Sequence, residues 1–201
     1  MEVPWGIFLA DLNISFPDMH KVLFLYSMDI QMTDQCPKIS ITNRIKPMQD
    51  PKSLTSVAAF HQTFKHPILS QPKIPDAKRC ELRVSLIAEE LKELEEAIAD
   101  QNIVEIADAL CDIQYVLSGA ILEFGLAEKF KDLFDEVQRS NMSKACKDLA
   151  EAEATVAHYQ NQGVDCFYEK EGEMYLVFRA GDRKTLKSVN YSPADLKSIL
   201  I

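Results

Sequence analysis

Acidic side chains are concentrated in one stretch of this 201-residue chain, where their spacing permits metal-assisted chemistry. Residues 81–112 contain ten carboxylates opposed only by Arg83 and Lys92, whereas the whole chain has a formal net charge of −9. An E-E-x-x-E sequence and an E-x-x-D sequence stand out within the stretch: Glu89, Glu90, Glu93, Glu105 and Asp108. Carboxylate oxygens favour hard divalent cations such as Mg²⁺ or Mn²⁺. No histidine or cysteine stands at ligand spacing among them to favour zinc.

Two predicted helices carry these carboxylates. Apolar side chains repeat at helical spacing from about residue 76 to 99, as one stripe of Ile87, Leu91, Leu94 and Ile98. The second helix is predicted over residues 103–124, and Gly125 ends it. Because residues 100–102 form the only connection, we expect the two helices to run antiparallel.

The antiparallel arrangement predicts which carboxylates face one another. If the chain reverses direction at Ala99, residues equally far before and after Ala99 lie at the same height, so Glu93 stands level with Glu105. Glu90 then stands level with Asp108, about 4.5 Å away along the axis. Four carboxylates this close repel strongly, and a divalent cation is the natural compensation. The alternative is a merely solvated acidic face, which is the usual role of glutamate-rich helices.

Together with their flanking segments, these motifs resemble a known family. The E-E-x-x-E and E-x-x-D sequences resemble the metal motif of MazG-like, all-α nucleoside triphosphate pyrophosphohydrolases, and the nearest branch is the phosphoribosyl-ATP pyrophosphohydrolase-like proteins. The segments 82–90, 105–110 and 139–144 match this branch as well. Residues 186–191 resemble the family's K-G-P-N-Y, with Ser-Val in place of Gly-Pro. The resemblance covers residues 53–196.

The resemblance implies a reaction and a set of metal ligands. The reaction is hydrolysis of a (deoxy)nucleoside triphosphate to the monophosphate and pyrophosphate, which would clear unwanted nucleotides. The implied ligands of Mg²⁺, with Mn²⁺ as a substitute, are Glu90, Glu93, Glu105 and Asp108. Glu89 would be a further ligand or, like Glu93, the base that orients or deprotonates water. A homodimer or higher homo-oligomer is implied too, and it would cover the acidic side of the second helix.

Further residues are candidates for substrate binding, partly through the same resemblance. They are His61, Asp112, Arg139, Asn141, Lys144, Lys187, Asn190 and Tyr191. A lysine or arginine there would stabilise negative charge on the leaving pyrophosphate. Plainer alternatives remain open, because Lys144 and Arg139 are also typical solvated helix-end cations and Asn141 is a typical helix cap. His61, a lone histidine, is more often structural than catalytic.

The predicted fold is mainly α, an antiparallel helical bundle with a small C-terminal β-hairpin appendage. Further helices are predicted over residues 53–64, with Ser53 as the N-cap, and over residues 127–139. An amphipathic stretch from about residue 144 to 160 precedes a hairpin, whose strands 166–168 and 174–178 flank the turn Glu171-Gly172. A short helix ends the chain.

Domain boundaries follow from the same patterns. Residues 1–47 lack a sustained period and are predicted to be a poorly ordered extension, with Met48 a candidate for the true start. Residues 48–201 form the predicted pyrophosphohydrolase domain, with a helical core at 53–144 and an appendage at 145–201.

The composition of the chain also bears on its class of protein, its partners and its compartment. An apolar fraction of 47% is typical of a globular protein, and no apolar run reaches the ~18 residues of a membrane span. The acidic balance disfavours nucleic-acid binding. Five cysteines without a C-x-x-C pair, and no secretory signal, favour reduced thiols in the cytoplasm.

Two other functions remain open. A phosphoribosyl-ATP pyrophosphohydrolase would share the chemistry, and a non-catalytic binding or dimerisation module would share the helices. A di-iron site is set aside, because no histidine follows a glutamate by three residues.

Overall fold

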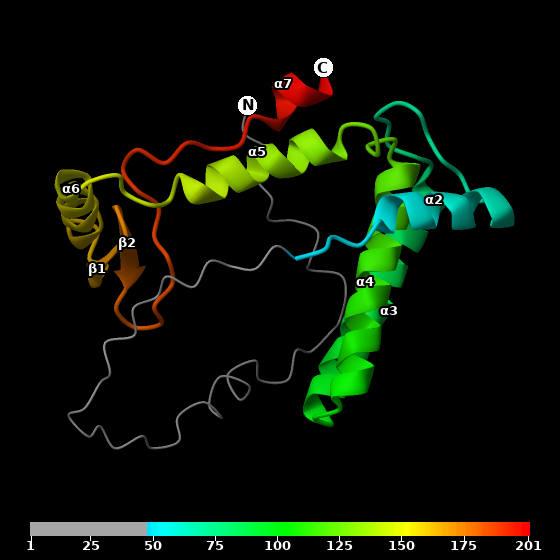
Figure 1. Cartoon of the computed structure of the whole chain (residues 1–201), viewed down its shortest axis with the longest axis horizontal. Helices are drawn as coiled ribbons and strands as arrows, with labels where there is room; N and C mark the ends of the chain where they lie inside the picture. Colours follow the sequence, from blue (N-terminus) through cyan, green and yellow to red (C-terminus); the bar gives the residue numbers. More distant parts are fainter. Residues whose placement is uncertain (1–47) are drawn as a thin grey trace. The chain divides into compact units, whose positions relative to one another are not determined.

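The computed structural model describes residues 48–201, and the predicted N-terminal extension of residues 1–47 lies outside them. The described part is mainly helical, with one two-stranded antiparallel sheet, which confirms the predicted fold class (Figure 1). The elements are α2 (Ser53–Phe64), α3 (Ala77–Ala99), α4 (Ile103–Glu123), α5 (Phe130–Met142), α6 (Leu149–Gln160), β1 (Cys166–Glu171), β2 (Met174–Arg179) and α7 (Leu196–Leu200). Among residues 48–201, no helix is long and apolar enough to cross a membrane.

Helices α3 and α4 form a hairpin, because only residues 100–102 separate them. Asp76 caps α3 by accepting a hydrogen bond from the Arg79 backbone N–H at 3.1 Å. Asn102 caps α4 by accepting from the Val104 backbone N–H at 3.1 Å. The two helices lie side by side (Figure 1). Their predicted bounds are correct to within one residue at each end, since caps and turn residues mark both ends.

Helix α2 packs against α4 and buries Val57 and His61. Its predicted bounds are confirmed, but the predicted N-cap is wrong. Lys52 occupies the cap position and no side chain caps the helix, so Ser53 is the first helical residue. Residues 66–76 after α2 form neither helix nor strand, and the Leu69 N–H donates to the Leu122 carbonyl at 3.0 Å.

Helices α5 and α6 begin later than the sequence pattern indicated. Helix α5 starts at Phe130 rather than residue 127, because a turn closed by the Lys129 N–H and the Leu126 carbonyl precedes it. Helix α6 starts at Leu149 with Asp148 as its cap. The residues before it cannot be helical, since Cys146 pairs with Tyr175 in an isolated β-bridge.

The predicted β-hairpin is confirmed, with Cys166 opposite Arg179 and Glu171 opposite Met174. It packs against α6 around a small buried cluster. That cluster comprises Cys146, Ala152, Cys166 and Val177. The appendage therefore has an apolar core of its own, which joins α6 to both strands.

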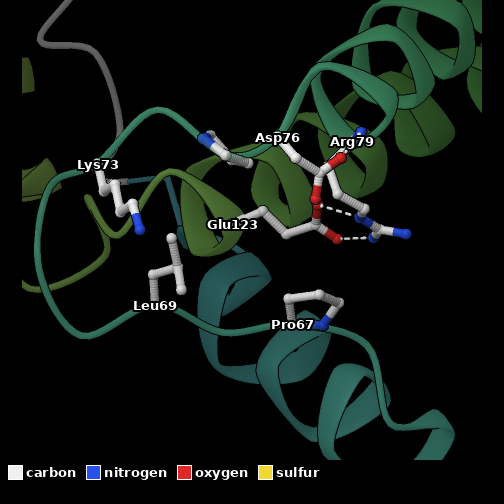
Figure 2. Close-up of a pocket in the computed structure, with 7 residues that line it drawn as sticks. Pro67, Leu69, Lys73, Asp76, Arg79 and Glu123 are labelled. Carbon is white, nitrogen blue, oxygen red and sulfur yellow. Dashed lines mark hydrogen bonds and ion pairs between the residues drawn. The ribbon is translucent and has the colours of Figure 1, made fainter.

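A buried group of charges joins the start of α3 to the end of α4. The Glu123 side chain is 1% exposed and accepts from Arg79 Nε at 2.9 Å (Figure 2). It also accepts from Nη2 of Arg79 and Nη2 of Arg83, and Arg83 is itself buried. Burial acts to raise the pKa of Glu123, but hydrogen bonds from the two guanidinium groups outweigh burial and hold the pKa below its ordinary value of 4.5.

We expect Glu123→Gln to lower the free energy of unfolding by about 3 kcal/mol, because it leaves Arg83 buried without a counter-ion. Urea denaturation at neutral pH measures the loss. Asp135→Asn removes an exposed helix-surface pair with Lys131, and as the control it should cost less than about 0.5 kcal/mol. A loss for Glu123→Gln no larger than the control's would show that this pairing does not hold the two helices together.

Candidate active site

The turn between α3 and α4 is centred on Gln101, and this corrects the predicted pairing of the carboxylates. The helices end at Ala99 and begin again at Ile103, so the pivot lies beyond Ala99. Moving the pivot by two residues shifts every level pair by four residues, which is about 6 Å or one helical turn. Glu90 is therefore level with Asp112, and Asp112 is the charge that acts most strongly on Glu90.

Glu90 is the most enclosed of the predicted metal ligands. It is half-buried, whereas the other predicted acidic site residues of the two motifs are exposed: Glu89, Glu93, Glu105 and Asp108. Burial raises the pKa of the Glu90 carboxyl, and neighbouring negative charges raise it further. Those charges are, in decreasing order, Asp112, Glu93, Glu89 and Asp108. Carboxylates of both α3 and α4 therefore raise the pKa of Glu90, which is expected if they lie on the same face of the hairpin as Glu90.

Near the turn, an open hollow of 360 Å³ is lined by carboxylates from both helices. Glu93 and Glu105 are among its lining residues, although with the turn centred on Gln101 they lie one helical turn apart along the hairpin rather than level. Glu96 and Asp100, which belong to neither motif, line it too. Within residues 48–201, no three His, Cys, Asp or Glu side chains are arranged to hold a metal ion. The carboxylates share a face, without converging on one point.

Several substrate-binding candidates lie together where α5 ends. Lys144 Nζ donates to Asn141 Oδ1 at 2.8 Å, and Lys187 Nζ lies 4.3 Å from the centre of the Tyr191 ring. The Tyr191 hydroxyl is in turn 2.9 Å from Ser140 Oγ. These contacts bring two distant parts of the chain into one place. We call this set the lysine group: Asn141, Lys144, Lys187, Asn190 and Tyr191.

Arg139 and Asn141 have definite places in this region. Arg139 donates to the Glu136 carboxylate from Nε at 2.7 Å and from Nη2 at 2.8 Å, and this pairing is the main cause of the low Glu136 pKa of about 2. A contact between Arg139 and pyrophosphate would have to compete with this ion pair. Asn141 is not a helix cap, because it lies in the last turn of α5 and Asp148 caps α6.

His61 lies in the core rather than at the acidic face. Its side chain is 2% exposed, and Nδ1 is 2.9 Å from the Pro67 carbonyl oxygen. Burial lowers its pKa, so the neutral ring is favoured. This environment favours the structural alternative for His61 over a contact with substrate.

Comparison with known proteins identifies the segment that carries the acidic face. Residues 57–141 match the family model described as phosphoribosyl-ATP pyrophosphohydrolase. This segment, called the family domain below, is less than half of the chain and resembles the phosphoribosyl-ATP pyrophosphohydrolase family of the MazG-like all-α superfamily. The family domain spans both acidic motifs and ends at Asn141, before Lys144 and the rest of the lysine group.

A viral protein is similar to part of the chain. It is "Uncharacterized protein L479" of Acanthamoeba polyphaga mimivirus, which is 36% identical over 99 residues. The aligned region covers 47% of this chain and 39% of the viral protein, so the chain spans about two fifths of that relative's length.

Within the family domain, sequence reasoning missed the buried charges of Arg79, Arg83 and Glu123. Arg79 and Glu123 border a hollow of 290 Å³, lined also by Lys73 and Asp76 (Figure 2). The available signal was Glu123 itself, a lone acid after Ile121-Leu122 in the most apolar part of its helix. A single such acid did not reveal its partners, since they lie forty residues or more earlier in the chain.

The crowding of charge around Glu90 can be tested directly. We expect Asp112→Asn to lower the pKa of Glu90 toward 4.5, because removal of the strongest neighbouring negative charge favours the ionised carboxylate. A pH titration followed by carboxyl ¹³C NMR measures the pKa. Glu95→Gln, on the same helix, removes an exposed charge that is not among those raising the Glu90 pKa, and it serves as the control. Equal small shifts in both variants would refute the pairing of Glu90 with Asp112.

Proposed function

We propose that this protein hydrolyses a (deoxy)nucleoside triphosphate between the α- and β-phosphates, in a Mg²⁺-dependent reaction that releases the monophosphate and pyrophosphate. One observation carries the proposal. The family domain contains a face on which carboxylates from α3 and α4 act on the half-buried Glu90. Such a concentration of like charge is relieved by a divalent cation.

The residues present suit Mg²⁺, because every candidate ligand is a carboxylate oxygen. Glu90, Glu93, Glu105 and Asp108 would supply the ligands of Mg²⁺, and Mn²⁺ could substitute for Mg²⁺. Bound Mg²⁺ would neutralise phosphate charge and lower the pKa of a water molecule. Glu89 or Glu93, both exposed, would orient that water or accept its proton.

The lysine group would bind the phosphate end of the substrate. Lys144 and Lys187 each supply a positive charge, and Asn141, Asn190 and Tyr191 supply amide and hydroxyl groups. Cations that stabilise negative charge on the leaving pyrophosphate favour cleavage of the α–β bond. In this proposal Asp112, half-buried beside Glu90, contacts the sugar or supports the ligands, and Arg139 has a subsidiary role because it pairs with Glu136.

We propose further that the protein works as a homodimer or higher homo-oligomer. The apolar stripe of α3 is partly exposed in the single chain, with Leu91 49% and Ile98 50% exposed. On α4, Ile103 and Leu110 are exposed as well. A second copy packed on the hairpin would bury this apolar surface.

Phosphoribosyl-ATP is the second candidate substrate, because the matching family model is described by that activity. It requires the same bond cleavage and the same acidic face, and it differs only in what the site recognises beyond the phosphates. A non-catalytic helical module is the remaining alternative.

A nucleotide panel tests these proposals. Ribo- and deoxyribonucleoside triphosphates and phosphoribosyl-ATP are each incubated with the protein and Mg²⁺, and pyrophosphate release is measured. We expect release that depends on Mg²⁺ and falls about 100-fold or more in Glu93→Gln, because that change removes a candidate base and ligand. Glu95→Gln, two residues away on the same helix and exposed, should keep the wild-type rate. If no substrate yields pyrophosphate, or if Glu93→Gln releases pyrophosphate as fast as the wild type, the proposed enzymatic function is excluded.

A further inference from the structure

We propose that α6 positions residues 187–191 beside Lys144, and so builds the part of the site that binds the pyrophosphate group of substrate or product. In this proposal Glu151, Thr155 and Tyr159 are positioning residues. The inference rests on the proposed function, and it assigns a role to an element that lies outside the family domain.

Three side chains on one face of α6 bind three consecutive residues. They stand four positions apart along the helix, a spacing that aligns them in a row. The hydrogen bonds run from Lys187 N to Tyr159 Oη at 3.2 Å, from Ser188 Oγ to Glu151 Oε1, and from Val189 N to Thr155 Oγ1 at 3.1 Å. The row therefore fixes the backbone path of residues 187–189.

The bonds to Glu151 and Thr155 involve buried side chains, which makes them costly to break, whereas the bond to Tyr159 is exposed. Thr155 is 0% exposed, Ser188 4% and Glu151 8%. Thr155 Oγ1 also donates to the Glu151 carbonyl at 2.7 Å, and Glu151 Oε2 accepts from the Lys147 N–H at 3.2 Å. Removing the partner of such a buried polar group destabilises the folded state, because the group is left without a hydrogen bond. The segment is therefore held in one conformation.

The fixed segment lies against the end of α5. The Ser188 N–H donates to the Lys144 carbonyl at 3.2 Å, so the backbone positions of Lys144 and Lys187 are tied together. The Asn190 N–H donates to Ser188 Oγ at 2.9 Å, which extends the fixed path toward Tyr191. Two lysines held in this way suit a ligand with several anionic oxygens, such as pyrophosphate.

The positioning role of Glu151, Thr155 and Tyr159 can be tested separately from the stability of the appendage. The buried cluster of Cys146, Ala152, Cys166 and Val177 joins α6 to the hairpin without involving residues 187–189. A change that removes one hydrogen bond of the row should therefore leave the appendage folded. It should alter the placement of Lys187 and its neighbours instead.

The test is Thr155→Val, which keeps the side-chain volume but removes the acceptor of the Val189 N–H, together with the hydroxyl's contacts to the Glu151 carbonyl and Cys146 Sγ. We expect the affinity for inorganic pyrophosphate, measured by isothermal titration calorimetry, to fall about tenfold. The KM for the nucleotide should rise by a similar factor with kcat nearly unchanged. Thr155→Ser keeps the hydroxyl and should restore both values. Circular dichroism and thermal unfolding establish that each variant is folded.

The outcomes separate this inference from the proposed function. Weaker pyrophosphate binding by Thr155→Val in a protein that hydrolyses no nucleotide would support the positioning role and remove the proposed function. Unchanged pyrophosphate affinity and KM, an equal loss in Thr155→Ser, or no pyrophosphate binding by the wild type would overturn the inference. If Thr155→Val does not fold, Tyr159→Phe removes only the hydroxyl that accepts from Lys187, and the same outcomes apply to it.

Discussion

The buried pairing of Glu123 with Arg79 and Arg83 fixes how α3 and α4 lie against one another. It joins the last residue of α4 to the first two turns of α3, at the open end of the hairpin. The other end is closed by the three-residue turn and the Asn102 cap. Because both ends are held, neither helix can slide along the other. The level pairing of Glu90 with Asp112 thus depends on contacts that include neither residue.

Two groups of opposite charge follow from this architecture. The carboxylates around Glu90 belong to the family domain, and the lysine group is built from the end of α5 and residues 187–191. An acidic face alone repels an anionic nucleotide. In the proposed function a divalent cation reverses that repulsion, and Lys144 and Lys187 bind the phosphates that the cation leaves uncompensated.

Local sequence patterns predicted the helices and strands well. Features that depend on contacts between residues far apart in the sequence could not be predicted in the same way. Apolar periodicity and the turn at residues 100–102 predicted α3 and α4 almost to the residue. The predicted pairing of the carboxylates was wrong by one turn, because the pairing depends on the centre of the connection, which is Gln101 rather than Ala99. The bond between Thr155 and Val189 leaves no periodic signal, since its donor is a backbone N–H that any residue except proline supplies. The burial of His61 is likewise set by packing with α4.

Binding of Mn²⁺, followed by paramagnetic broadening of backbone amide NMR signals, tests the central claim most directly, because it requires no turnover. The account predicts that substoichiometric Mn²⁺ first broadens signals near Glu90 and Glu93 on α3 and near Asp108 on α4, and that excess Mg²⁺ reverses the effect. Equal broadening around isolated exposed acids such as Glu128 and Glu153, or broadening that Mg²⁺ leaves unchanged, would contradict a divalent-cation site on the acidic face.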